Sequence, residues 1–123
     1  MKSAKGTVFM AGERMEVLID AGCVQKIDTE IAARLPYIIG KLCSMLQRRD
    51  AARLFVRKIK IGDTVALLDK QSGFAFRLTM QAHSVQILGI FEHQSYPKKS
   101  AQHAVYLFDN RLMWAMAGGK AAA

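Results

Sequence analysis

Cysteine and proline are both scarce in this chain of 123 residues, with two of each. Cys23 and Cys43 have nineteen residues between them, which fits neither a zinc-binding spacing nor a redox dipeptide motif. We interpret them as small buried residues of a protein in a reducing cytoplasm. The three histidines lie ten residues apart, without the close spacing of a metal site, so we expect no metal and no other cofactor.

Long apolar runs are absent as well. No segment approaches the roughly 18 uninterrupted apolar residues that cross a bilayer, and Glu13 comes before any apolar core of signal-peptide length. The chain also lacks a glycine-rich phosphate loop, a serine nucleophile motif and a paired-carboxylate signature. We therefore expect a cytoplasmic protein that does not bind membranes.

Positive charge is what the chain has in excess. Eighteen Lys and Arg residues against ten Asp and Glu residues give a formal net charge of +8. The cations gather in a few groups: Arg48 and Arg49, Arg53, Arg57 and Lys58, Lys60, and Lys98 and Lys99. This excess favours a polyanionic partner, RNA or DNA, although a basic domain without such a partner has the same composition.

The first half of the chain predicts two strands and two helices within a single domain that spans residues 1–123, with residues 1–6 and 118–123 frayed. The strands are expected at Thr7 to Met10 and at Met15 to Ile19. Asp28 or Thr29 suits the N-cap of a short helix, and Pro36 suits the first turn of a longer helix that reaches about Arg49. Apolar residues at helical spacing predict that this helical pair packs on a core.

The second half predicts mainly strands and turns. Ala51 to Lys60 is expected as a strand or an extended basic linker, and Val105 to Trp114 as an apolar element of either type. The remaining elements are a turn at Gly62 and Asp63, a strand from Thr64 to Asp69, a turn from Lys70 to Gly73, a strand from Phe74 to Gln81, a hairpin connection from Ala82 to Ser84 and a strand from Val85 to Phe91.

The order of these elements predicts an α+β fold, in which a small antiparallel twisted sheet has the helical pair packed on one face. Alternation along the Phe74 strand assigns its residues to the two faces of the sheet. Phe76 and its even-numbered neighbours, Phe74, Leu78 and Met80, are expected in the core. Arg77 is expected on the other face, which should stay open.

Two stretches of the sequence resemble the core of the RelE/ParE toxin superfamily. The first runs from Leu67 through the Ser72-Gly73 turn to Leu78, and the second runs from Val85 to Tyr96. In that family a strand, a Ser-Gly turn, a strand with an aromatic residue and an arginine, and a last apolar strand surround the active cleft. The resemblance covers residues 15–100 and implies a RelE-like arrangement of the sheet.

The resemblance also implies a function, that of a ribosome-dependent mRNA endoribonuclease of a toxin–antitoxin system that needs no metal. Arg77 matches the arginine that stabilises the phosphate, His93 fits the acid or base, and Tyr96 fits a group that stacks on a base or orients the ribose 2′-OH. The residues expected to bind the nucleic-acid backbone are Arg57, Lys58, Lys60, Lys98 and Lys99. His83 and His103 are interpreted as bystanders. An antitoxin protein and a second copy of the chain are the expected protein partners.

Two interpretations without catalysis remain open, so the sequence alone does not decide whether the chain is an enzyme. A strand from Met15 to Ile19 followed by two helices is also the order of a ribbon-helix-helix DNA-binding regulator. Alternatively, the segment from Val105 to Trp114 serves as an interaction or inhibitory surface that binds a partner or a second copy.

Overall fold

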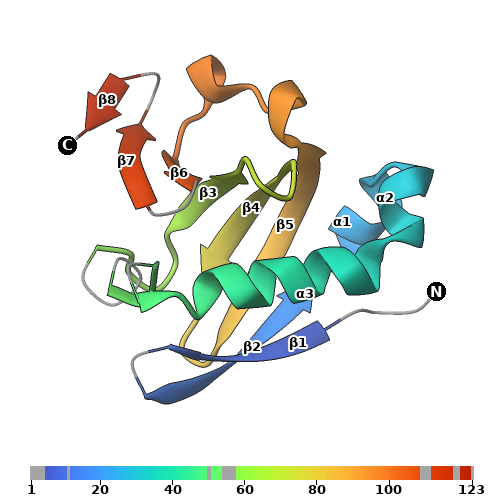
Figure 1. Ribbon diagram of the computed structural model, residues 1–123, viewed down its shortest axis with the longest axis horizontal. Coiled ribbons are helices and arrows are strands. Elements are labelled where there is room, and N and C mark those ends of the chain that lie inside the picture. The colour runs from blue at the N-terminus through green and yellow to red at the C-terminus, as the bar shows by residue number, and fades with distance from the viewer. Residues whose placement is uncertain are drawn as a thin grey trace.

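The computed structural model describes residues 5–10, 12–49, 51–53, 58–108, 112–117 and 120–122, and for residues 112–117 and 120–122 it describes the course of the backbone alone. Figure 1 shows a sheet with a long helix across one face. The strands are β1 (Lys5–Met10), β2 (Glu13–Ile19), β3 (Thr64–Asp69), β4 (Phe74–Met80), β5 (Ser84–Glu92), β6 (Ala104–Phe108), β7 (Leu112–Ala117) and β8 (Lys120–Ala122). The helices are α1 (Ala21–Lys26), α2 (Thr29–Ala33) and α3 (Leu35–Leu46), with the 3-10 turns η1 (His93–Ser95) and η2 (Lys98–Ser100).

The described strands form one mixed sheet in the order β1-β2-β5-β4-β3-β6-β7-β8. Its β2–β5 and β3–β6 pairs are parallel, whereas the other neighbours are antiparallel. The predicted α+β class is confirmed, but the prediction of a small antiparallel sheet was wrong. Parallel pairing needs long crossover connections, and here the helices and the segment with η1 and η2 provide them.

The helical layer follows the local signals in the sequence. The Asp28 carboxylate accepts from the Glu30 N–H at 2.8 Å and caps α2, and Pro36 lies in the first turn of α3, as predicted. The apolar stripe of α3 is buried at Leu35, Ile38, Ile39, Leu42, Met45 and Leu46. Helix α1 was not predicted, although Asp20 caps it by accepting from the N–H groups of Gly22 and Cys23.

The predicted register of β4 is confirmed. Phe76 and Leu78 are fully buried on the side of α3, and Phe74 and Met80 are nearly so. They pack with apolar residues of β1, β2, β5 and α3 into the main core. The turn before β4 is tight, and Gly73 adopts a φ of +82°, which other residues rarely tolerate.

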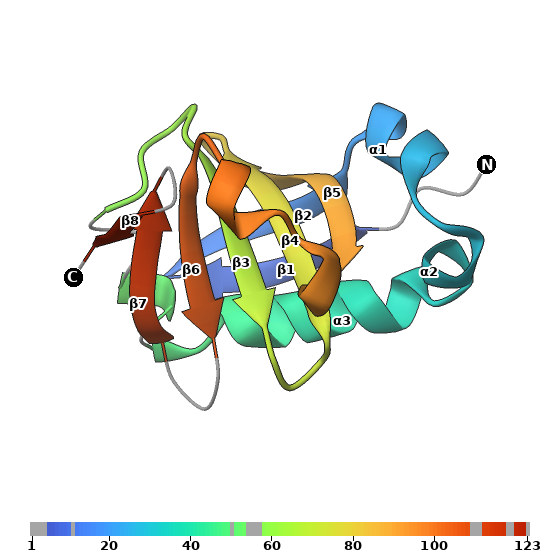
Figure 2. The ribbon, with the colours of Figure 1, turned by 90° about the horizontal axis from the view of Figure 1, so that it is seen from above.

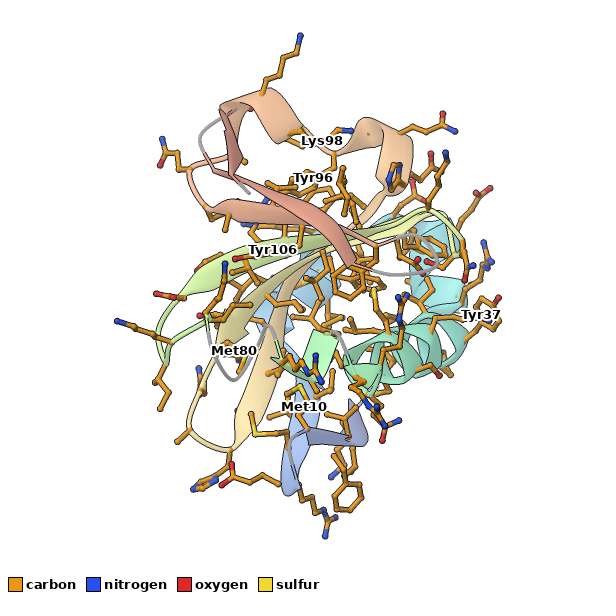
Figure 3. All side chains as sticks on the ribbon, turned by 60° about the vertical axis from the view of Figure 1, so that its left-hand side comes forward. Met10, Tyr37, Met80, Tyr96, Lys98 and Tyr106 are labelled. Atoms are coloured by element: carbon orange, nitrogen blue, oxygen red, sulfur yellow. The ribbon has the colours of Figure 1, made fainter. Side chains whose placement is uncertain are left out.

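The opposite face of the sheet is covered, contrary to the prediction that it stays open. Because β4 and β3 separate β5 from β6 in the sheet, the chain from His93 to His103 must cross these two strands (Figure 2). Tyr96 and Ala101 of this crossing segment form a second buried cluster with Ala66, Leu68, Ala75 and Val105. In Figure 3, Tyr96 and Lys98 lie on this side of the sheet, and Met10 and Met80 lie on the other.

Some segments differ from their predictions. Residues 51–53 are helical and Lys58 lies in a turn, so the Ala51–Lys60 stretch is not a strand where the structure describes it. Lys5 and Gly6 belong to β1 and Lys120–Ala122 form β8, and both strands pair with a neighbouring strand. The apolar element from Val105 to Trp114 belongs to the hairpin β6–β7, and residues 109–111 within it lie outside the described part.

Strand β2 lies inside the sheet, with β1 on one edge and β5 on the other. A ribbon-helix-helix dimer needs a strand whose free edge pairs with a second copy. The hypothesis that Met15 to Ile19 forms such a ribbon was therefore wrong for this chain. Within the described residues, no helix combines the length and apolar character needed to span a bilayer.

Candidate functional site

Arg77 projects from β4 toward the crossing segment, at a place where the β4–β5 ladder is irregular. The register shifts between Arg77, which pairs with Gly89, and Leu78, which pairs with Ile87. Such bulges often redirect a side chain next to a functional site. A Cβ atom on Gly89 would lie 2.8 Å from the Phe91 ring. Only glycine therefore lets Phe91 fold back over this position.

The Arg77 side chain lies against two aromatic residues. Its guanidinium carbon is 5.1 Å from the centroid of the Phe91 ring, within the range of a cation–π contact. Phe91 in turn meets Tyr96 edge to face, with the ring centroids 5.2 Å apart. The side chain of Arg77 is half-buried, and its buried Nε has no hydrogen-bond partner among the described residues. The contact with Phe91 holds the guanidinium in place, and the Nε–H group remains without a hydrogen-bond acceptor among the described residues.

Tyr96 and His103 complete this group, because the Tyr96 hydroxyl and the Nε2 atom of His103 share a hydrogen bond. Burial raises the pKa of Tyr96 against the opposing effect of Arg77, so the phenol keeps its proton at neutral pH. Burial, and after it the charge of Arg77, lowers the pKa of His103 below 6.5. Its imidazole is therefore neutral at pH 7 and able to accept a proton.

The structure brings together two of the three predicted catalytic residues and adds a third that was dismissed. Arg77 and Tyr96 lie together, and the histidine beside them is His103, which was interpreted from the sequence as a bystander. Tyr96 is 4% exposed, so of its two expected roles the orientation of a neighbouring group fits its burial better than stacking on a base. One feature of the sequence could have indicated His103. This residue follows Tyr96 by seven positions, and a loop of that length can bring the two side chains together.

His93 lies apart from this group, at the end of β5, where its N–H donates to the Gly73 carbonyl at 2.7 Å. Burial, then the charges of Lys98 and Lys70, lowers the pKa of His93, whereas Asp69 opposes that shift. Arg77 is not among the charges that act on it. The described contacts therefore place His103, and not the predicted His93, beside Tyr96.

The predicted backbone-binding cations do not converge on one place. Lys98 is half-buried near His93, and Lys99 is exposed on the same 3-10 turn. Lys58 and Lys60 are exposed before β3, whereas His93 and Gly73 lie beyond its other end. The six residues of β3 separate them by about 17 Å at roughly 3.3 Å a residue. Arg57 lies outside the described residues.

A cleft of about 560 Å³ opens beside His93. Its walls come from α2 and the residue that follows it, from the β3–β4 turn with the start of β4, and from the end of β5. The lining residues are Glu30, Ile31, Arg34, Lys70, Gly73, Phe74, Glu92, His93 and Gln94. The described residues contain no group of three or more His, Cys, Asp or Glu side chains placed to hold a metal ion.

Comparisons with protein-family models, with curated proteins and with solved structures found nothing that matches this chain.

Proposed function

We propose that this protein is a metal-independent, ribosome-dependent mRNA endoribonuclease of the toxin type, with Arg77, Tyr96 and His103 as its active group. The observation that carries the proposal is the convergence of the Arg77 guanidinium, the Tyr96 hydroxyl and the neutral His103 imidazole beside one another. The basic charge of +8 and the resemblance to the RelE/ParE superfamily support the same interpretation. The two stretches that carry the resemblance lie in β3, β4, β5 and η1, and these three strands are adjacent and antiparallel in the sheet.

In the proposed reaction His103 removes the proton of the ribose 2′-OH, and the resulting oxygen attacks the adjacent phosphorus. The bond between the phosphorus and the 5′ oxygen breaks, and His103 donates the proton it has received to that 5′ oxygen. The products are a 2′,3′-cyclic phosphate and a 5′-hydroxyl end. Arg77 stabilises the charge that grows on the phosphate, because its guanidinium is always ionised and is held in place before the substrate binds. Tyr96 orients the imidazole through their hydrogen bond.

Expression in a bacterial host and incubation with translating ribosomes test this proposal together. Wild-type protein is expected to arrest growth and to cut mRNA, and Arg77→Ala and His103→Gln should each lower cleavage about a hundredfold or more. His83→Gln, at an exposed histidine outside this group, serves as the matched control and should retain cleavage. Intact transcripts on actively translating ribosomes would refute the catalytic proposal. Growth arrest relieved by a co-expressed small acidic protein would fit the antitoxin partner and the cytoplasmic location that the proposal requires.

A second candidate, nucleic-acid binding without catalysis, follows from the burial of Tyr96. A tyrosine that is 4% exposed, packed against Phe91 and bonded to His103, also suits a brace that fixes the crossing segment on the sheet. In that case the His103→Gln variant loses stability but binds RNA or DNA as the wild type does, and neither protein cuts the strand.

A further inference from the structure

The cleft beside His93 is separate from the Arg77 group and has the size of a ligand pocket. Its volume of about 560 Å³ falls within the range of ~300 to 1,000 Å³ typical of small-molecule sites. Three segments distant in the sequence supply its walls, through Glu30 and Arg34, Lys70 and Phe74, and Glu92 and His93. A pocket assembled in this way is fixed by the fold and not by a single loop.

Two cations, Arg34 and Lys70, lie in the lining of the cleft, together with the carboxylates of Glu30 and Glu92. No ion pair joins Arg34 or Lys70 to a described carboxylate. Asp69, next to Lys70, is used differently, since its carboxylate oxygens accept from the N–H groups of Gln71 and Ser72, both at 3.3 Å. Lys98 adds a further positive charge near His93. This wall of the cleft therefore attracts an anion.

A flat cation lies on one side of the cleft. The Arg34 guanidinium carbon is 5.3 Å from the centroid of the Phe74 ring and 5.6 Å from that of Tyr37. Arg34 is exposed and Tyr37 is 53% exposed, so this stack is accessible to solvent. Unpaired RNA bases stack on aromatic rings and on guanidinium planes in this way. A nucleotide matches the cleft, because its planar base can stack on Arg34 and its phosphate is attracted by the cations of the wall.

We propose that this cleft binds one unpaired nucleotide of a single-stranded RNA, with its phosphate at Lys70 and its base against Arg34. The inference rests on the proposed action on RNA and adds a subsite for a nucleotide that flanks the bond to be cut. The Glu30 and Glu92 carboxylates also line the cleft and repel phosphate, which restricts the phosphate to the side of Lys70.

The test is the fluorescence anisotropy of a short labelled oligouridylate titrated with the full chain. Lys70→Ala and Arg34→Ala are each expected to weaken binding on the order of tenfold. Lys70→Ala should also make the salt dependence shallower by about 0.7 in the logarithmic slope, as for the loss of one phosphate contact. Lys60→Ala is the matched control, because it removes the same charge at the opposite end of β3. It should change affinity less than about twofold.

The outcomes separate this subsite from the cleavage reaction. If Lys70→Ala and Arg34→Ala bind as Lys60→Ala does, the subsite is overturned, whatever the cleavage assay gives. If they bind more weakly while the wild type leaves ribosome-bound mRNA intact, the subsite stands and the endoribonuclease proposal fails. Lys70 is exposed in a turn, so its variant keeps the fold even if Arg34→Ala loosens the stack on Phe74.

Discussion

Tyr96 and His103 share a hydrogen bond across the segment that crosses the sheet, and burial, followed by the charge of Arg77, lowers the pKa of that histidine. The bond joins the two ends of the loop around Pro97 and η2. Burial and the charge of Arg77 keep the imidazole neutral beside the guanidinium. The bond thus stabilises the crossing segment next to a group that can accept a proton.

Tyr96→Phe isolates the role of the hydroxyl in that contact. The ring still packs against Phe91, so the loss is a single hydrogen bond, and the free energy of unfolding should fall by about 0.5 to 1.5 kcal/mol. If Tyr96 orients His103, cleavage falls far more than this loss of stability explains. Urea titration measures the first effect and the ribosome assay the second. An active Tyr96→Phe variant would remove Tyr96 from the mechanism.

Gly89→Ala tests whether Phe91 positions Arg77. The added methyl group would meet the Phe91 ring at 2.8 Å, so the ring must shift away from its place beside the guanidinium. We expect a loss of stability of about 1 to 3 kcal/mol, as for overpacking, together with reduced cleavage. Gly40→Ala is the control, because a methyl group at that position on α3 would meet no neighbouring side chain within 4 Å. Equal behaviour of the two variants would show that the close approach at Gly89 has no consequence.

Phe76→Ala tests the register of β4. Phe76 is fully buried in the main core, and its truncation should cost about 3 to 5 kcal/mol of the free energy of unfolding. Thr79→Ala is the comparison on the other face. Its hydroxyl donates to the Asp63 carbonyl at 3.1 Å, so its loss should cost only about 1 kcal/mol. Similar small costs in urea titrations would contradict the assigned faces.

The two histidines with lowered pKa values predict the direction of the pH dependence. Below pH 6.5 the unfolded chain binds more protons at His93 and His103 than the folded chain does. Stability should therefore fall as the pH drops from about 6.5 through the lowered folded-state pKa values. Replacing either histidine by Gln should flatten this fall in thermal unfolding. A fall in both variants identical to that of the wild type would contradict the assignment.

Local signals explain which elements were predicted correctly. The Asp28 cap, Pro36 in the first turn of α3 and the period-two pattern of β4 depend on neighbours within a few residues, so the sequence contains them. Helix α1 was missed because it has only six residues, one of them a glycine, and so short a stretch shows no clear helical period.

The candidate site was only partly predictable. The place of Arg77 on the face of β4 opposite Phe76 follows from strand alternation. The exchange of His93 for His103 does not, because it depends on how the chain returns over the sheet after Tyr96. From the sequence, His93 and His103 are equally good candidates for the histidine of the site, because the path of the chain after β5 decides which of them returns to Arg77.

Composition and short-range periodicity were enough to predict the α+β class, the main core and the basic charge, because each depends on residues that are close together in the chain or on their totals. The parallel pairs β2–β5 and β3–β6, the covered second face and the partner of Tyr96 emerged only from the folded arrangement. Each of these joins residues whose contact comes from crossover connections. These contacts are stabilised by burial against segments that are distant in the chain. A local sequence pattern therefore does not predict them.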